Sequence, residues 1–381
     1  MIGLSDFLNQ MIDKNMLIYL TNSLIVEMND ARFADIKRCA KYLALAMIEH
    51  NHLVRGDYEV LEWLAKVMEG YDEDGVKVYT RLYKRYSTYV IPSCLHYYVE
   101  VVLNMPNKDL LQINGVSVKP VQYTYFLDSS KVQVMPFIGE DSADCEFYAH
   151  IGNSYLSAYG INLLLQMRHE KGNGSGVASA TQEYVNAHKP VISIIDSDKK
   201  YPTQPIDSNS TFAKCNAVWS NLPKVNEIYS FHVVQTQEIE NLIPYNYING
   251  LTLWNGQCYS NKVAFDKLYN SPDREIILSY FDLKNGLKKK SEMDWCIDYL
   301  DYAVMCYSCF DNTSSRDTIR NMPNDQELCP RLHRALLKKT NEYIENHDNL
   351  QPQLLEFQQC EWNKIGMMLL DMCCAGKEAF V

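Results

Sequence analysis

The sequence predicts an α/β protein in which a parallel sheet flanked by helices lies between two helical regions. Short apolar segments alternate with helical segments in the middle of the chain, which is typical of βαβ units. Apolar residues recur at helical spacing before and after that part. The chain has 381 residues, 47% of them hydrophobic, enough for two or three packed units. We expect a helical N-terminal region at 1–128, a catalytic α/β domain at 129–290 and a helical C-terminal region at 291–381.

In the N-terminal region, three segments have helical periodicity. They are FADIKRCAKYLALAMIEH, EVLEWLAKVMEG and GVKVYTRLYKRYSTYVIP. The third interleaves tyrosines with four basic residues, Lys77, Arg81, Lys84 and Arg85. One interpretation is a nucleic-acid contact, with rings for stacking and cations for phosphate. The other is an ordinary amphipathic helix with a basic polar face.

From about residue 130, strands and helices alternate. The expected strands are KVQVMPFI, INLLLQM, PVISII and EIYSFHVV, and the expected helices are DSADCEFYAHIGNSYLSAYG and ASATQEYVNAH. The loop HEKGNGSG either wraps a phosphate with its backbone N–H groups or is a flexible surface loop. In parallel sheets, ligands bind at the carboxyl ends of the strands.

Three of these strand ends carry acidic residues. Glu140 and Asp144 follow the first strand, Asp196 and Asp198 follow VISII, and Glu238 and Glu240 follow the last strand. Like charges brought together repel unless a cation neutralises them, and carboxylate oxygens suit Mg²⁺ or Mn²⁺. The pattern therefore predicts a metal site, although any single acid at a strand end, such as Asp141, can simply cap a helix.

The order of Glu140, Asp144 and a DxD closing an apolar strand resembles the TOPRIM fold of topoisomerases, primases and OLD-family nucleases. The segment QEIENLIP is similar to the Ile-Glu-Asn stretch of OLD-like proteins. The resemblance covers about 130–290. It implies a catalytic or metal-binding Glu140, metal ligands at Asp144, Asp196, Asp198 and Glu240, with Glu238 as second choice, and a phosphate-stabilising lysine at Lys284 in YFDLKNG. The alternative for Lys284 is a solvated turn lysine beside KKK.

The chain departs from that family's pattern at three points. Asp141 stands where glycine is usual, Leu242 stands where tyrosine is common, and the sequence contains no GxxxxGK[ST] nucleotide-binding stretch. The resemblance therefore implies a stand-alone metal-dependent nuclease using two Mg²⁺ or Mn²⁺ ions on DNA or RNA. It also implies an antiphage or toxin-type role, with a separately encoded ATPase as a partner.

Two other function classes stay open. A sugar-nucleotide glycosyltransferase would use Asp196 and Asp198 for Mn²⁺ and a diphosphate but leaves the other acids without a role. A catalytically inactive TOPRIM scaffold would bind no metal. Separately, the spacing of Cys306, Cys309, Cys329 and His333 fits a zinc site, although Pro330 and the expected helix around Cys306 disfavour it.

Composition sets the remaining expectations. The net charge of −11 disfavours a protein that coats nucleic acid, but metal ions and local basic residues still permit action on it. The chain has no apolar run of about 18 residues and no signal-peptide pattern, and its twelve cysteines form no compact framework. These features predict a cytoplasmic protein without a membrane span. From the aromatic content of the N-terminal region we expect it either to form a homodimer or to hold a partner.

Overall fold

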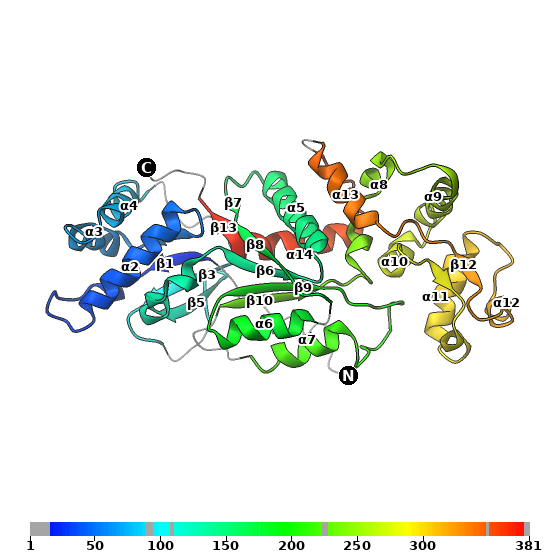
Figure 1. Cartoon of the computed structure of the whole chain (residues 1–381), viewed down its shortest axis with the longest axis horizontal. Helices are drawn as coiled ribbons and strands as arrows, with labels where there is room; N and C mark the ends of the chain where they lie inside the picture. Colours follow the sequence, from blue (N-terminus) through cyan, green and yellow to red (C-terminus); the bar gives the residue numbers. More distant parts are fainter. Residues whose placement is uncertain are drawn as a thin grey trace.

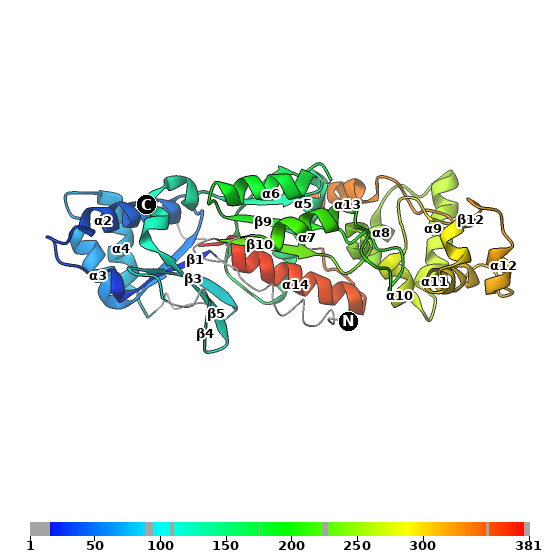
Figure 2. The same ribbon diagram turned by 90° about the horizontal axis from the view of Figure 1, so that it is seen from below.

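The computed structural model describes residues 16–87, 94–106, 110–174, 176–222, 228–347 and 350–376. The molecule is elongated, with three parts in a row along its long axis: an N-terminal part, a middle part with the four-stranded sheet, and a third, mainly helical part (Figures 1 and 2). None of the helices in these ranges combines the length and apolar composition needed to cross a membrane.

The N-terminal part contains a five-stranded sheet, so the expectation of a helical region at 1–128 is wrong. The sheet has the order β2-β1-β3-β5-β4, and only β4 runs antiparallel to its neighbour. The strands are β1 (Leu17–Leu20), β2 (Leu53–Gly56), β3 (Tyr97–Val102), β4 (Leu111–Ile113) and β5 (Val116–Gln122). The helices are α2 (Phe33–Ile48), α3 (Tyr58–Val67) and α4 (Glu73–Lys84), with the 3₁₀ turns η1 (Asn22–Leu24), η2 (Tyr123–Leu127) and η3 (Ser129–Val132).

The N-terminal sheet is hard to predict from the sequence because its first strands are short and buried. β1 and β2 have four residues each and are almost wholly buried, so neither shows the alternation of polar and apolar residues that marks a half-buried strand. The three helices do form where the periodicity predicts them.

The middle part confirms the predicted parallel sheet flanked by helices. Its strands have the order β10-β9-β6-β8 and all pairs are parallel. They are β6 (Met135–Gly139), β8 (Met167–Lys171), β9 (Val191–Ile195) and β10 (Tyr229–Val233). The helices α5 (Ser142–Ala158) and α14 (Glu356–Cys373) cover one face, and α6 (Gly176–Asn186) and α7 (Thr211–Trp219) cover the other (Figure 1).

One predicted strand is placed differently. The segment INLLLQM supplies only the short β7 (Leu164–Leu165), which pairs with β13 (Cys374–Ala375), and the first residue of β8. The rest of β8 comes from residues expected in the loop. β8 is an edge strand with Arg168 and His169 exposed, so it lacks the apolar run by which a buried strand is recognised.

The third part is mainly helical. It contains η4 (Ile239–Leu242), α8 (Tyr245–Gly250), α9 (Gly256–Tyr269), α10 (Arg274–Tyr280), η5 (Ser291–Asp294), α11 (Ile297–Ser308), α12 (Arg316–Arg320) and α13 (Leu336–Glu345). The boundary expected at residue 290 separates β11 (Leu287–Lys288) from β12 (Glu327–Cys329), although these two strands pair with each other. The closing helix α14 then returns to the middle sheet, so residues 291–376 do not form a region of their own.

Candidate active site

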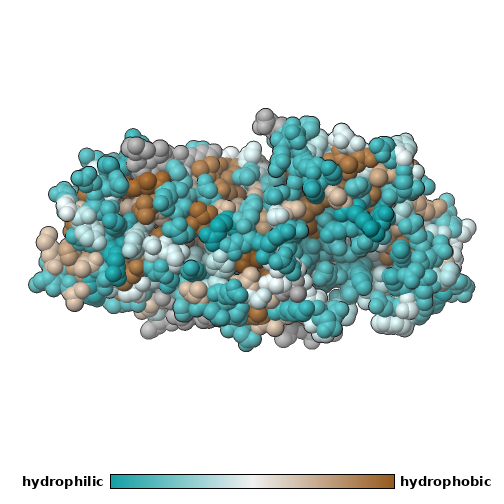
Figure 3. Space-filling view, in the orientation of Figure 1, coloured by the Kyte–Doolittle hydropathy of each residue, from teal (hydrophilic) through white to brown (hydrophobic). Residues whose placement is uncertain are grey.

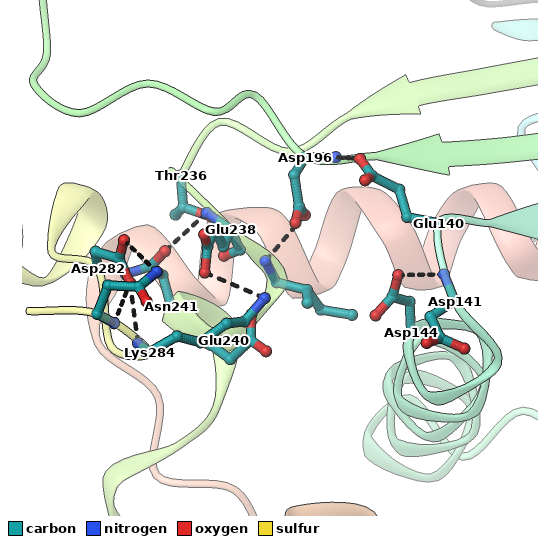
Figure 4. Close-up of polar contacts among 12 residues, drawn as sticks. Glu140, Asp141, Asp144, Asp196, Thr236, Glu238, Glu240, Asn241, Asp282 and Lys284 are labelled. Atoms are coloured by element: carbon teal, nitrogen blue, oxygen red, sulfur yellow. Dashed lines mark hydrogen bonds and ion pairs between the residues drawn. The ribbon is translucent and has the colours of Figure 1, made fainter. Parts of the chain in front are cut away.

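The acidic residues of three strand ends lie together at the carboxyl edge of the middle sheet (Figure 4). Glu140 follows β6, Asp196 follows β9, and Glu238 and Glu240 follow β10. Backbone N–H groups connect them: Asp196 N–H donates to Glu140 Oε1 at 3.3 Å, and Ile239 N–H donates to Asp196 Oδ1 at 2.9 Å. We call Glu140, Asp144, Asp196, Glu238 and Glu240 the acidic cluster.

Asp144 joins the cluster because the first turn of α5 packs closely on the end of β6. A Cβ atom on Gly139 would lie 2.8 Å from Cys145 Sγ, so a side chain there would push the helix away. Asp141 caps the helix and shares a capping box with Asp144, whose Oδ2 accepts the Asp141 N–H at 2.8 Å. Asp141 is exposed and pairs with Lys171 at 2.9 Å. The helix-capping interpretation is therefore correct for Asp141.

Lys284 is the cation within the cluster. Its Nζ lies 3.3 Å from Glu238 Oε2 and 3.1 Å from Glu240 Oε2. The turn that carries it is fixed by Asp282, whose Oδ1 accepts the N–H groups of Lys284 at 3.0 Å and Asn285 at 2.7 Å. Lys284 therefore lies among the acids, and its predicted role as a phosphate-stabilising lysine stays a prediction.

Side chains that sequence reasoning missed hold this arrangement in place. Asn241 Oδ1 accepts the Glu238 N–H at 2.8 Å, while its Nδ2 donates to Leu278 O and Phe281 O, both at 2.8 Å. From α14, Gln358 donates to Asn241 O at 2.9 Å, and Trp362 donates to Leu242 O at 2.9 Å. Of these residues, the sequence singles out Asn241 alone, as the Asn of Ile-Glu-Asn. That motif indicates the family resemblance and does not indicate that Asn241 bridges two segments.

Burial and mutual repulsion raise the pKa values of the cluster. Burial is the larger cause and raises the pKa of Glu140 to about 7, of Asp144 to about 6 and of Glu238 to about 7. The pKa values of Asp196 and Glu240 are also raised by burial; the charges of Glu140 and Glu240 add to the effect at Asp196. Burial lowers the pKa of Lys284, but its two glutamate partners raise it more. Five buried or half-buried carboxyl groups thus lie around one ammonium group, which pairs directly with Glu238 and Glu240.

Asp198, the second predicted ligand of DSD, points away from Asp196, and its role as a metal ligand stays a prediction. Its backbone has a left-handed conformation with φ of 57°, and its N–H donates to Gln237 O at 3.0 Å. The side chain is exposed, whereas that of Asp196 is buried. The charge of Asp198 still raises the pKa of Glu140. Asp198 therefore lies at the rim of the cluster.

The donor set fits a divalent ion by its chemistry. Every ligand atom is a carboxylate oxygen, which Mg²⁺ and Mn²⁺ prefer, and the excess of negative charge favours a cation. In the part of the chain that the structure describes, no three His, Cys, Asp or Glu side chains stand ready to enclose an ion. At this site the carboxylates already have partners within the chain. Lys284 forms ion pairs with Glu238 and Glu240. Glu140, Asp144 and Asp196 each accept a hydrogen bond from a backbone N–H group.

The four zinc candidates do not form such a set either, within the same described ranges. Cys306 and Cys329 are fully buried. Cys309 Sγ donates to Met305 O at 3.7 Å, and His333 Nδ1 accepts the Ala335 N–H at 3.1 Å. The structure thus assigns these side chains to packing and local hydrogen bonds.

The basic residues of α4 are not brought to the acidic cluster. α4 packs on α2 and α3 in the N-terminal part, at the end of the molecule away from the third part (Figure 1). Tyr79 is fully buried and its hydroxyl donates to Ala40 O at 2.7 Å, so its ring is unavailable for stacking on a base. Lys77 pairs with Asp74 at 3.0 Å. Lys84 and Arg85 are exposed and Arg81 is partly buried on the same helix end.

The glycine-rich loop supports the backbone at Glu140. Gly172 N–H donates to Gly139 O at 2.9 Å, and Gly174 N–H donates to Glu140 O at 3.4 Å. A Cβ atom on Gly172 would lie 2.9 Å from Gly139 O. Because these N–H groups bind carbonyl groups of the chain, they are not available to a phosphate.

Comparison of the chain with protein-family models, with curated proteins and with solved structures gave no match. A function for the chain has to be argued from the residues of the site.

Proposed function

We propose that this protein hydrolyses phosphodiester bonds of nucleic acids with the help of a divalent metal ion, Mg²⁺ or Mn²⁺. The observation that carries the proposal is the acidic cluster with Lys284 at the carboxyl edge of a parallel sheet. The resemblance to TOPRIM nucleases supports the same conclusion. It adds an antiphage or toxin-type role and a separately encoded ATPase partner to the proposal.

The residues that would hold the metal are Glu140, Asp144, Asp196, Glu238 and Glu240, with Asp198 at the rim. Two ions suit a cluster with this many carboxylates. When bound, such ions supply Lewis-acid activation of water and neutralise charge on the phosphate.

The chain's own residues supply proton transfer and positioning. In the metal-free site burial raises the pKa of Glu140 to about 7, so its carboxyl group can give up or take a proton near neutral pH, as a general acid or base requires. Direct contact with a cation would lower this pKa and make Glu140 a metal ligand instead. Lys284 carries a full positive charge between two strand-end glutamates, where it can stabilise negative charge on a phosphate oxygen. Asn241 is a positioning residue, because it connects the glutamate segment to the turn that carries Lys284.

Cleavage of plasmid DNA and total RNA with Mg²⁺ or Mn²⁺ tests the proposal. We expect the wild type to cleave one of them, and expect Glu140→Gln and Asp196→Asn to be at least about 100-fold slower, as for removal of an essential catalytic group. Chelation by EDTA should abolish the activity. Glu62→Gln is the matched control, because Glu62 lies on α3 in the N-terminal part.

Two results would contradict the proposal. Cleavage that survives in both cluster variants would come from another site or a contaminant. Consumption of a nucleotide sugar without any nuclease activity would favour the glycosyltransferase.

A further inference from the structure

A hollow of about 320 Å³ opens beside the acidic cluster. Its lining includes Gln237, which precedes Glu238, and the turn of Asp282 to Gly286 that carries Lys284. Lys200, two residues beyond Asp198, contributes another wall. The hollow is therefore lined by chain neighbours of Glu238 and Lys284, not by the acidic cluster itself. Most of its lining comes from the third part of the molecule, where hydrophilic residues dominate the face in Figure 3.

The wall of the hollow is fixed by backbone contacts. Gly286 has φ of 74°, and a Cβ atom there would lie 2.5 Å from both Arg331 N and Cys329 O. Leu332 N–H and His333 N–H donate to Leu283 O at 2.9 and 3.2 Å. The segment after β12 is thus held directly on the turn that carries Lys284, which brings Arg331 to the hollow.

The lining is basic in a chain whose net charge is −11. Its cations are Lys200, Lys288, Lys290, Arg331 and Arg334, against the two acids Asp282 and Glu327. The Asp282 carboxylate accepts hydrogen bonds from backbone N–H groups of its own turn. Lys290 forms an ion pair with Asp325 at 2.9 Å. Arg331 and Arg334 are exposed and form no ion pair with any described residue.

Aromatic rings accompany these cations. Tyr280 and Tyr299 line the hollow. Tyr299 is buried and stacks on Tyr201 with ring centroids 4.9 Å apart, so the half-buried Tyr280 is the ring of this pair that a base can reach. A positively charged groove with aromatic side chains is the usual composition of a single-strand binding site. The volume lies at the small end of ligand cavities, roughly 300–1,000 Å³, which suits one or two nucleotides and not a duplex.

We infer that this hollow binds backbone phosphates of a single-stranded nucleic-acid segment, next to the phosphate that is cleaved. Arg331 and Arg334 contact the phosphates there. The inference rests on the proposed function for its position in the reaction, but binding itself is measured without cleavage.

The test is the binding of a short fluorescein-labelled single strand, followed by anisotropy with Ca²⁺ present over a range of salt concentrations. We expect Arg331→Gln/Arg334→Gln to bind on the order of tenfold more weakly than the wild type. The slope of log K against log salt should fall by about 0.7 for each lost phosphate contact. Arg38→Gln/Lys66→Gln removes the same charge from exposed ion pairs of the N-terminal part and should bind as the wild type does.

The outcomes separate this inference from the proposed function. Unchanged affinity and slope in Arg331→Gln/Arg334→Gln would overturn the inference, even if the wild type cleaves nucleic acid. Tighter binding of a blunt duplex than of the single strand would also overturn it. Weaker binding by Arg331→Gln/Arg334→Gln, with unchanged binding by the control variant, supports the inference. If the wild type then cleaves nothing, only the proposed function fails. Circular dichroism of both double variants establishes that they are folded.

Discussion

Replacing Lys284 with methionine removes the cation of the acidic cluster but keeps a side chain of similar length. The lysine Nζ lies 3.3 Å from Glu238 Oε2 and 3.1 Å from Glu240 Oε2, and it is 34% exposed. Unit charges 4 Å apart attract by about 4 kcal/mol at an effective dielectric constant near 20. Removing one partner of a buried pair costs roughly 3–5 kcal/mol. Because Lys284 is partly exposed, we expect the metal-free variant to lose about 3 kcal/mol of unfolding free energy at pH 8.

The loss should depend on pH with a definite sign. Without Lys284, the folded-state pKa values of Glu238 and Glu240 rise further above the unfolded value of about 4.3. The folded variant then retains protons that the unfolded chain has already released. The difference from the wild type is therefore largest above pH 7, where keeping the glutamates ionised is most costly, and it shrinks below about pH 5 as the unfolded chain takes up protons too.

Urea unfolding in EDTA at pH 5 and pH 8, followed by tryptophan fluorescence, measures this difference. Trp362 donates to Leu242 O at 2.9 Å and so reports on the glutamate segment. Lys66→Met is the matched control: Lys66 Nζ also lies 3.1 Å from a glutamate oxygen, Glu62 Oε1, but Lys66 is 67% exposed. Exposed pairs of this kind contribute about 0.3–0.5 kcal/mol. Equal losses in the two variants, or a Lys284→Met loss that does not change with pH, would refute the reasoning.

Three further predictions follow from the same contacts. The metal-free wild type should lose stability as pH rises from about 4.5 to 7, because Glu140 and Glu238 have pKa values raised to about 7. Thermal unfolding should show that Mg²⁺ reduces this loss. A rise in the stability of the metal-free protein over this pH range would contradict the prediction. Asp141→Ala should cost about 1 kcal/mol through loss of the α5 cap yet retain metal-dependent cleavage; complete loss of cleavage in a folded variant would show a catalytic role instead. Glu361→Gln should cost about 2 kcal/mol at pH 7, because burial raises the pKa of Glu361 but its contacts with His232 and Lys364 lower it to about 2. That stabilisation is present above pH 4.3 or so and is lost as pH falls toward 2, so urea unfolding at pH 7 and pH 3 should show a smaller difference at the lower pH.

The sequence allowed the middle sheet and most of the acidic cluster to be predicted for a local reason. Glu140 and Asp196 each follow an apolar strand directly, and parallel strands bring their carboxyl ends to one edge. The position of Asp198 at the rim could not be predicted, because a left-handed backbone at an aspartate is a tertiary outcome that the letters DSD do not show. The N-terminal sheet was missed because β1 and β2 have only four residues each and are almost wholly buried.

The contacts that hold the site residues in place could not be predicted, because they join residues that are far apart in the chain. Gln358 reaches Asn241 across more than 100 residues, and Arg331 meets the turn at Gly286 only through packing of backbone on backbone. In the sequence, the densest group of basic residues with tyrosines lies in α4. The structure instead gathers a different basic group, Lys200, Lys288, Lys290, Arg331 and Arg334, around the hollow.

The most direct test of the central claim is Mn²⁺ binding to the purified chain, measured by electron paramagnetic resonance of the free ion. We expect the wild type to bind Mn²⁺ and Asp196→Asn to bind it at least about tenfold more weakly, because a buried carboxylate ligand is lost. Asp74→Asn, which changes an exposed acid of α4, should bind Mn²⁺ as the wild type does. Equal Mn²⁺ affinity in the wild type and Asp196→Asn would contradict the central claim, since the acidic cluster would then not be the metal site.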